Sequence, residues 1–169
     1  MDHLPKHDEM LLVLSTKLGA ALKARGYTLT LAESCTGGMV AQFVTAVAGS
    51  SVWFDRGFIT YSNQAKIDML GVSNQTLEAF GAVSEQTANE MASGALQNSI
   101  AQIAGSITGI AGPDGGTLDK PVGMVCFAWV GKNIPLSATT HQFKGNREEI
   151  RQQAAIAMMA GLIDRLKLN

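Results

Sequence analysis

The stretch TLTLAESCTGGMV, residues 28–40, carries the pattern that decides the fold of this chain. Its first part alternates polar and apolar side chains, which predicts a strand over residues 27–33. Short polar residues and two glycines interrupt the apolar run, and helical spacing resumes over residues 36–48. A strand that enters a helix through so short a turn is typical of layered α/β domains.

Strand and helix patterns alternate along the rest of the sequence, but without a strict β–α–β period. We therefore predict a three-layer α/β/α fold, with a mixed β-sheet covered by helices on both faces. Asn146 and Glu149 form a capping-box pattern at the start of the last helix. The other predicted helices cover residues 10–25, 63–70 (capped by Asn63), 74–80 (capped by Ser73) and 85–98 (capped by Ser84), and the other predicted strands cover residues 52–62, 103–109, 122–130 and 136–143.

The composition indicates one globular domain spanning residues 1–169, in which residues 1–7 are expected to form a frayed tail. Hydrophobic residues make up 46% of the chain and charged residues 16%, so the chain can bury a core and is not of the disordered class. A net charge of −1 gives no basic surface for nucleic acid, and no run of about twenty apolar residues predicts a membrane span. We expect a cytoplasmic protein that binds neither nucleic acid nor membranes.

Ser34 stands between the predicted strand and the predicted helix, where the backbone N–H groups of a helix start lack partners. These groups belong to Cys35, Thr36, Gly37 and Gly38, and with the helix dipole they can hold an oxyanion or a phosphate. The arrangement predicts a serine nucleophile beside a binding site. The alternative is structural, because Ser34 or Thr36 can equally cap the helix.

A serine nucleophile needs a base, and the segment YSNQAK, residues 61–66, offers one without histidine. Tyr61 ends a predicted strand, and Lys66 lies early in the next helix. For Lys66 to act as a base, its pKa must fall from about 10.4 to near 7, which burial beside another cation can achieve. The tyrosine hydroxyl can relay the proton. In the alternative interpretation, the tyrosine lies at a sheet edge and the lysine is solvated.

Histidine chemistry has less support, since His141 is the only histidine beyond the first ten residues. A Ser34–His141 triad has no third member at a recognisable spacing, and a Cys35–His141 pair requires a thiol that can equally be a packing residue. His3 and His7 lie close together, but no group of side chains has the spacing of metal ligands. We expect neither a metal nor a cofactor.

A second glycine-rich segment, TGIAGPDGG at residues 108–116, follows a predicted buried strand. It lacks the Walker phosphate-binding pattern, but its glycines allow the backbone to wrap closely around a ligand. A structural turn explains the same glycines. Arg147, at the start of the last helix, can meet a phosphate or remain a solvated charge.

Five stretches of the sequence, taken together, closely resemble the CinA C-terminal domain family. They are LAESCTGG (31–38), GFITYSNQAKIDMLGV (57–72), GAVSEQTANEMASGA (81–95), SITGIAGPDGGTLDKPVGMV (106–125) and NREEIRQQA (146–154). Active stand-alone members of this family are nicotinamide-nucleotide amidohydrolases, or NMN deamidases. The resemblance therefore implies hydrolysis of nicotinamide mononucleotide (NMN) to nicotinate mononucleotide and ammonia, a step of pyridine-nucleotide salvage.

The resemblance also implies roles for individual residues. Ser34 would attack the carboxamide carbon, Lys66 and Tyr61 would move the proton, and Arg147 would contact the phosphate. The small-molecule nucleotide is the expected partner, and a homo-oligomer, dimer or larger, is the expected assembly. The implied substrate-binding residues are Cys35, Thr36, Gly37, Gly38, Thr108, Gly109, Gly112 and Arg147.

Two other functions fit parts of the same pattern. Short-chain dehydrogenases also combine serine, tyrosine and lysine, but there the tyrosine precedes the lysine by four positions and the glycine-rich loop follows the first strand. Here Tyr61 precedes Lys66 by five positions, and the glycine-rich loop comes late. A non-catalytic nucleotide-binding or regulatory module of the same fold is the second alternative, and it would bind the mononucleotide without releasing ammonia.

Overall fold

The computed structural model describes residues 6–167 and contains one mixed five-stranded sheet in the order β2-β1-β3-β4-β5. β1 runs parallel to both β2 and β3, whereas β4 is antiparallel to β3 and β5 is antiparallel to β4. The strands are β1 (Leu29–Glu33), β2 (Phe54–Ile59), β3 (Ile103–Gly109), β4 (Met124–Gly131) and β5 (Ile134–Gln142).

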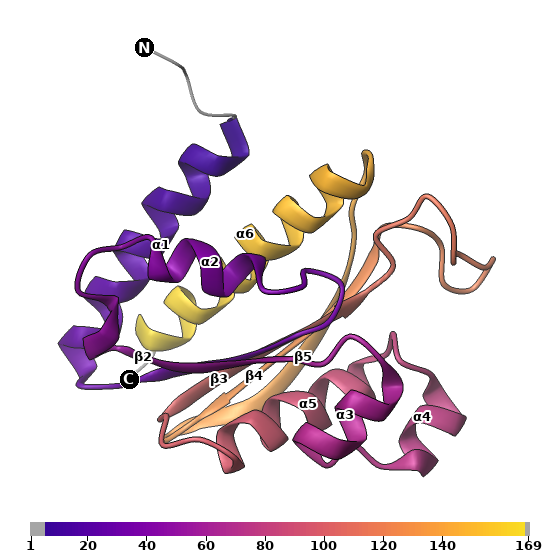
Figure 1. The fold of residues 1–169 in the computed structure, drawn as a ribbon, viewed down its shortest axis with the longest axis horizontal. Coiled ribbons are helices and arrows are strands. Elements are labelled where there is room, and N and C mark those ends of the chain that lie inside the picture. Colours follow the sequence, from indigo (N-terminus) through magenta and orange to yellow (C-terminus); the bar gives the residue numbers. More distant parts are fainter. Residues whose placement is uncertain (1–5, 168–169) are drawn as a thin grey trace.

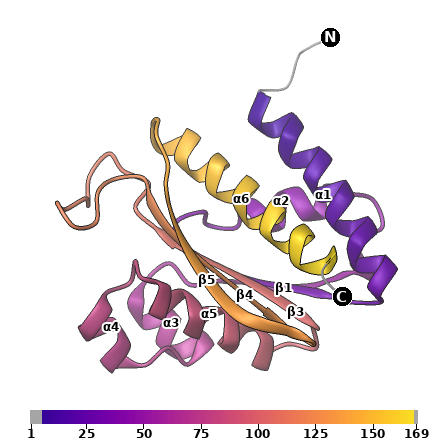
Figure 2. The same cartoon turned by 180° about the vertical axis from the view of Figure 1, so that it is seen from behind.

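Helices cover both faces of this sheet, as Figures 1 and 2 show from opposite sides. α1, α2 and α6 lie on one face, and α3, α4 and α5 lie on the other. The predicted three-layer α/β/α fold is therefore confirmed. The helices are α1 (Lys6–Arg25), α2 (Met39–Thr45), the 3₁₀ turn η1 (Ser50–Val52), α3 (Asn63–Leu70), α4 (Asn74–Phe80), α5 (Glu85–Gln97) and α6 (Arg147–Lys167).

Strand β1, which lies between β2 and β3, is buried along its whole length because helices pack on both of its faces. Leu29 and Leu31 join the core that contains the buried faces of α1 and α6, whereas Ala32 joins the smaller core under α3 and α5. A near-continuous apolar strand is what a parallel strand covered on both faces requires. On β3, Gly105 leaves the room that the Met158 side chain of α6 fills.

Most of the predicted N-cap residues are confirmed, and one is wrong. The predicted serine caps are confirmed, because Ser73 Oγ accepts from Thr76 N and Ser84 Oγ accepts from Thr87 N. The capping box of α6 is confirmed by reciprocal bonds of 2.8 and 3.0 Å between Asn146 and Glu149. At α3, however, the cap is Ser62 rather than Asn63, whose position is already helical.

Two further helix starts differ from the sequence-based expectation, and β2 (Phe54–Ile59) is shorter than the strand predicted over residues 52–62. α1 begins at Lys6, so Lys6 and His7 are helical rather than part of a frayed tail, and residues 1–5 lie outside the described part of the chain. The first turn of α1 is held by α6, since His7 Nδ1 lies 2.9 Å from Gln152 Oε1. α2 begins at Met39 instead of residue 36, because Gly37 and Gly38 adopt left-handed conformations (φ 57° and 100°) that an α-helix cannot contain.

Candidate active site

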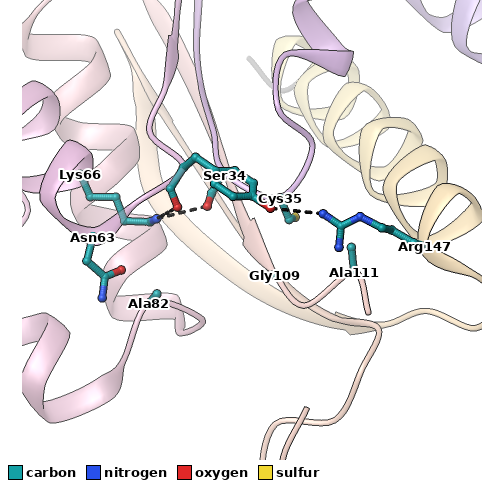
Figure 3. Close-up of a pocket in the computed structure, with 9 residues that line it drawn as sticks. Ser34, Cys35, Asn63, Lys66, Ala82, Gly109, Ala111 and Arg147 are labelled. Carbon is teal, nitrogen blue, oxygen red and sulfur yellow. Dashed lines mark hydrogen bonds between the residues drawn. The ribbon is translucent and has the colours of Figure 1, made fainter. Parts of the chain in front are cut away.

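A pocket opens where β1, β2 and β3 end, at one edge of the parallel part of the sheet. Ser34 directly follows β1, Tyr61 follows β2 by two residues, and Gly109 is the last residue of β3. Parallel strands place their carboxyl ends at the same edge, which is where open α/β sheets bind ligands. The pocket is lined by Ser34, Cys35, Tyr61, Asn63, Lys66, Ala82, Gly109, Ala111 and Arg147 (Figure 3).

The two residues predicted as nucleophile and base meet in this pocket. The distance between Lys66 Nζ and Ser34 Oγ is 3.1 Å, which is a hydrogen bond (Figure 3). Lys66 reaches the serine from the first turn of α3, and only 1% of its surface is exposed. A solvated surface lysine, the alternative interpretation, is therefore wrong.

The surroundings of Lys66 favour its neutral form. Burial lowers the pKa of Lys66, and no carboxylate in residues 6–167 lies within ion-pair distance of its amine. The neighbouring Cys35 thiol supplies no counter-charge at neutral pH, because burial raises its pKa to about 12. The remaining contacts of Nζ are backbone carbonyls, those of Thr60 at 2.9 Å, Tyr61 at 3.3 Å and Ser62 at 3.5 Å. A neutral amine that donates its two hydrogens to the nearer two carbonyls, those of Thr60 and Tyr61, keeps its lone pair for the Ser34 hydroxyl.

Neither Ser34 nor Thr36 caps α2, so the structural alternative for this turn is also wrong. The N-cap residue is Gly38, which provides no side-chain hydrogen bond. The carboxylate of Glu33 takes this role instead, because it accepts from the backbone amides of Val40 (3.0 Å) and Ala41 (3.1 Å). Ser34 is thereby left free to contact Lys66.

Glu33 also accepts from Thr36 Oγ1 at 2.7 Å and is completely buried. Its role escaped the sequence analysis because the contacts reach as far as eight residues along the chain and depend on the conformation of the turn. A fully buried carboxylate with three hydrogen-bond donors is a positioned group. It ties the end of β1 to the start of α2.

The turn after Ser34 leaves only some of the predicted N–H donors available. The amide of Gly37 donates to the carbonyl of Ser34 at 3.0 Å, and the amide of Ser34 itself donates to Ile107 O. Within residues 6–167, no acceptor is bound to the amides of Cys35, Thr36 and Gly38. The predicted set of oxyanion donors therefore loses Gly37.

The Tyr61 side chain lies in the pocket, but its hydroxyl contacts neither Ser34 nor Lys66. Instead, Arg147 Nη2 donates to the Tyr61 hydroxyl at 3.2 Å. The same guanidinium donates through Nη1 to the carbonyl of Gly112 at 2.7 Å. Arg147 is thus brought to the pocket as predicted, whereas a relay through Tyr61 stays a prediction.

The glycine-rich segment at residues 108–116 forms part of the pocket wall, and its predicted binding residues contact other parts of the protein. Thr108 is buried, and its hydroxyl donates to the carbonyl of Ala82 at 2.7 Å, so it supports the pocket wall from behind. Gly109 lines the pocket, but the reason for a glycine at this position is packing against β4. An added Cβ would lie 2.7 Å from a Val125 methyl group. Gly112 has a left-handed conformation (φ 77°) and offers its carbonyl to Arg147.

Sequence reasoning missed two other residues of the site. Asn63 was considered only as a helix cap, yet its side chain lines the pocket on the same side as Lys66 (Figure 3). Arg151 donates from Nε to Cys35 O at 3.1 Å and from Nη2 to Thr36 O at 3.0 Å. The one available signal was spacing, since Arg151 follows Arg147 by four residues and therefore shares its helix face.

His141 does not belong to the pocket, which removes the histidine alternatives. It lies on the edge strand β5, three strands from β1, so the separation is about 14 Å from strand spacing alone. Its ring packs against Phe127 and Phe143. In residues 6–167, no three His, Cys, Asp or Glu side chains are grouped to hold a metal ion, and His3 of the metal alternative lies outside this range.

None of the helices described in the structure is long and apolar enough to cross a membrane.

Comparison with known proteins gives one consistent result. The model of the CinA C-terminal domain matches residues 12–166. The "Nicotinamide-nucleotide amidohydrolase PncC" of Enterobacter agglomerans is 57% identical over 85% of this chain and 87% of its own length. The protein of the same name from Escherichia coli K12 is 54% identical over 87% of this chain and 89% of its own. The crystal structure of the competence/damage inducible protein CihA from Agrobacterium tumefaciens superposes with a TM-score of 0.91 at 42% identity, covering 98% of this chain and 99% of that one.

Proposed function

The chain belongs to the CinA C-terminal domain family, and from this membership we propose that it hydrolyses the carboxamide of NMN to nicotinate mononucleotide and ammonia. The relatives from Enterobacter agglomerans and Escherichia coli, which are named for this activity, match most of the chain at 57% and 54% identity. The observation that carries the proposal is the 3.1 Å contact between Ser34 Oγ and the buried Lys66 Nζ. It supplies the nucleophile and the base that hydrolysis of an amide needs.

In the proposed mechanism, neutral Lys66 takes the hydroxyl proton while Ser34 Oγ attacks the carboxamide carbon. The resulting oxyanion accepts hydrogen bonds from backbone amides of the turn, of which Cys35 and Thr36 are free. Protonated Lys66 then gives its proton to the leaving nitrogen, and ammonia departs with cleavage of the C–N bond. The product of this half-reaction is an ester between the Ser34 hydroxyl and the carboxyl group of nicotinate mononucleotide.

The second half-reaction runs through the same groups. Lys66, neutral again, takes a proton from water, and the water oxygen attacks the ester carbon. The tetrahedral intermediate collapses, the Ser34 oxygen leaves and recovers its proton from Lys66, and nicotinate mononucleotide is released. No step requires a metal ion or a cofactor.

We assign the substrate phosphate to Arg147, the other basic residue that lines the pocket beside Lys66. Figure 3 shows Ser34 and Cys35 lying between Lys66 and Arg147, so the scissile bond and the phosphate would occupy opposite ends. A phosphate offers Arg147 a charged acceptor in place of the Tyr61 hydroxyl, which would free that hydroxyl for the relay. A cytoplasmic location and a homo-oligomeric state remain predictions.

The test is release of ammonia and nicotinate mononucleotide from NMN by the purified full chain, measured with a chelator present throughout. We expect turnover that continues after exhaustive chelation and is absent from a Ser34→Ala sample prepared in parallel. Binding of NMN with no ammonia released would instead favour the non-catalytic module. Activity that requires added divalent ion would contradict the metal-free mechanism, and NAD(P)H consumption would favour the dehydrogenase alternative.

A further inference from the structure

Arg151 holds the turn that carries the proposed nucleophile, yet it does not line the pocket. From the second turn of α6, its Nε donates to Cys35 O at 3.1 Å and its Nη2 donates to Thr36 O at 3.0 Å. Within residues 6–167, no carboxylate pairs with this guanidinium. Its charge is therefore directed at two consecutive carbonyls of the Ser34 turn.

Because of peptide geometry, the hydrogen bond from Arg151 to the Cys35 carbonyl also fixes the direction of the Thr36 N–H. In a planar trans peptide, the N–H points opposite to the C=O of the same unit. The unit between Cys35 and Thr36 has its carbonyl bound by Arg151, so the Thr36 N–H points away from the guanidinium. No residue between 6 and 167 accepts from that N–H. Arg151 therefore holds in place a free donor two residues from the nucleophile.

The neighbouring peptide units explain why this donor needs external support. The amide of Gly37 is bound by Ser34 O, and the first amides of α2 are bound by Glu33. The peptide units of Cys35 and Thr36 lie between these anchors. Among the described residues, the Cys35 carbonyl accepts only from Arg151, whereas the Thr36 carbonyl accepts from both Arg151 and Met39 N. A cation on a carbonyl also polarises the peptide and strengthens its N–H as a donor.

We propose that Arg151 is a positioning residue that preorganises the oxyanion-binding amides of the Ser34 turn. This inference rests on the proposed amide hydrolysis. The residue acts through the backbone and does not touch the substrate, so its contribution belongs to the transition state, in which the oxyanion forms. Preorganised donors stabilise developing charge and contribute little to ground-state binding.

The kinetic test compares Arg151→Ala and Arg151→Lys with the wild type. Removal of a whole oxyanion donor costs about 10²–10³-fold in kcat, and we expect the loosened turn of Arg151→Ala to lose about 10–100-fold. The KM for NMN should change by less than about 3-fold, because the phosphate contact is intact. Arg151→Lys keeps the charge but can bind only one carbonyl well, so its kcat should be intermediate. Added guanidinium ion should partly restore Arg151→Ala.

Arg165→Ala is the matched control. Arg165 is also a half-buried arginine of α6, and its guanidinium donates to Ser137 Oγ and to Gly161 O at the other end of the helix. Its loss should lower stability without changing kcat. An equal loss of kcat in Arg165→Ala, a wild-type kcat in Arg151→Ala, or a rise in KM alone would overturn the proposal.

A second measurement does not depend on activity. ¹⁵N relaxation of the full chain should show lower order parameters for the Cys35 and Thr36 amides in Arg151→Ala, with those of the Ser84 turn unchanged. Unchanged order at both amides would overturn the positioning role. If the wild type released no ammonia from NMN, the proposed function would fail, and the relaxation data would still decide whether Arg151 orders the turn.

Discussion

Four serines precede helices in this fold, and they are used in two different ways. On one face of the sheet, Ser62, Ser73 and Ser84 each accept a backbone amide of the helix they precede, at 3.0–3.1 Å. On the other face, α2 begins at a glycine without a side-chain cap, and Ser34 contacts Lys66 instead. The difference shows that a serine at a helix start becomes available for chemistry only if another group satisfies the helix.

Glu33 is that other group. Its carboxylate binds the amides of Val40 and Ala41, which a capping serine would otherwise compete for. The two left-handed glycines, Gly37 and Gly38, keep Ser34 outside the helix. The Glu33 side chain before Ser34 and the two glycines after it thus keep the proposed nucleophile out of the helix cap.

The sharpest test of this contrast is Ser34→Ala. We expect it to lower NMN hydrolysis by more than about 10³-fold, because removal of a nucleophile disables the whole catalytic unit. The folded fraction should remain at the wild-type level, because Ser34 caps nothing. The measurement is ammonia release at equal folded fraction, with Cys35→Ala as the neighbour control that keeps most activity. Loss of activity in Cys35→Ala alone would reverse the assignment.

Lys66 tests the chemical half of the comparison. Arginine keeps the positive charge but does not provide a neutral base, so Lys66→Arg should lose about 10²–10⁴-fold in kcat, as should Lys66→Met. In the wild type, kcat/KM should rise with pH through the lowered pKa of Lys66 and then level off, because only the neutral amine acts as the base. Near-normal kcat in Lys66→Arg would exclude Lys66 as the base and shift attention to Tyr61.

Glu33 tests the structural half. Glu33→Gln keeps the size of the side chain but turns one acceptor oxygen into a donor and removes the charge. Because the group is fully buried with three donors around it, we expect a loss of about 1.5–3 kcal/mol in the free energy of unfolding, together with a lower kcat. Denaturant unfolding and ammonia release measure the two effects. Wild-type stability in this variant would show that α2 does not depend on Glu33.

The smallest effect is expected at a capping serine that lies outside the pocket. Ser73→Ala removes the acceptor for Thr76 N and should cost about 1 kcal/mol, the usual value for an N-cap. Its kcat and KM for NMN should equal those of the wild type, because α4 contributes no residue to the pocket lining. If the kcat of Ser73→Ala fell as far as that of Ser34→Ala, the distinction between capping serines and the proposed nucleophile would be wrong.

Local patterns predicted the elements well where local chemistry decides them. The caps at Ser73 and Ser84 follow from one side chain and the amide three residues on, and the strand at residues 103–109 follows from an apolar run. Helical spacing predicts the start of α2 three residues too early, because spacing does not report the left-handed conformations of Gly37 and Gly38.

The site was predictable in its chemistry and less so in its geometry. The pairing of Ser34 with Lys66 follows from the need of a serine for a base and from the family resemblance. The contacts of Arg151 join a side chain to backbone carbonyls 115 and 116 residues away, and no sequence pattern records such a contact. The hydrogen bond from Arg147 to the Tyr61 hydroxyl likewise joins residues 86 positions apart and has no sequence pattern.

The groups around the Lys66 amine, apart from Ser34, have a consequence for how the protein can evolve. They are main-chain carbonyls of Thr60, Tyr61 and Ser62, so their identity does not depend on the side chains at those positions. Substitutions there can change the rim of the pocket and leave the surroundings of Lys66, the proposed base, unchanged. Under the proposed mechanism, substrate preference can therefore change during evolution through substitutions at the pocket rim, while Lys66 keeps the same backbone contacts.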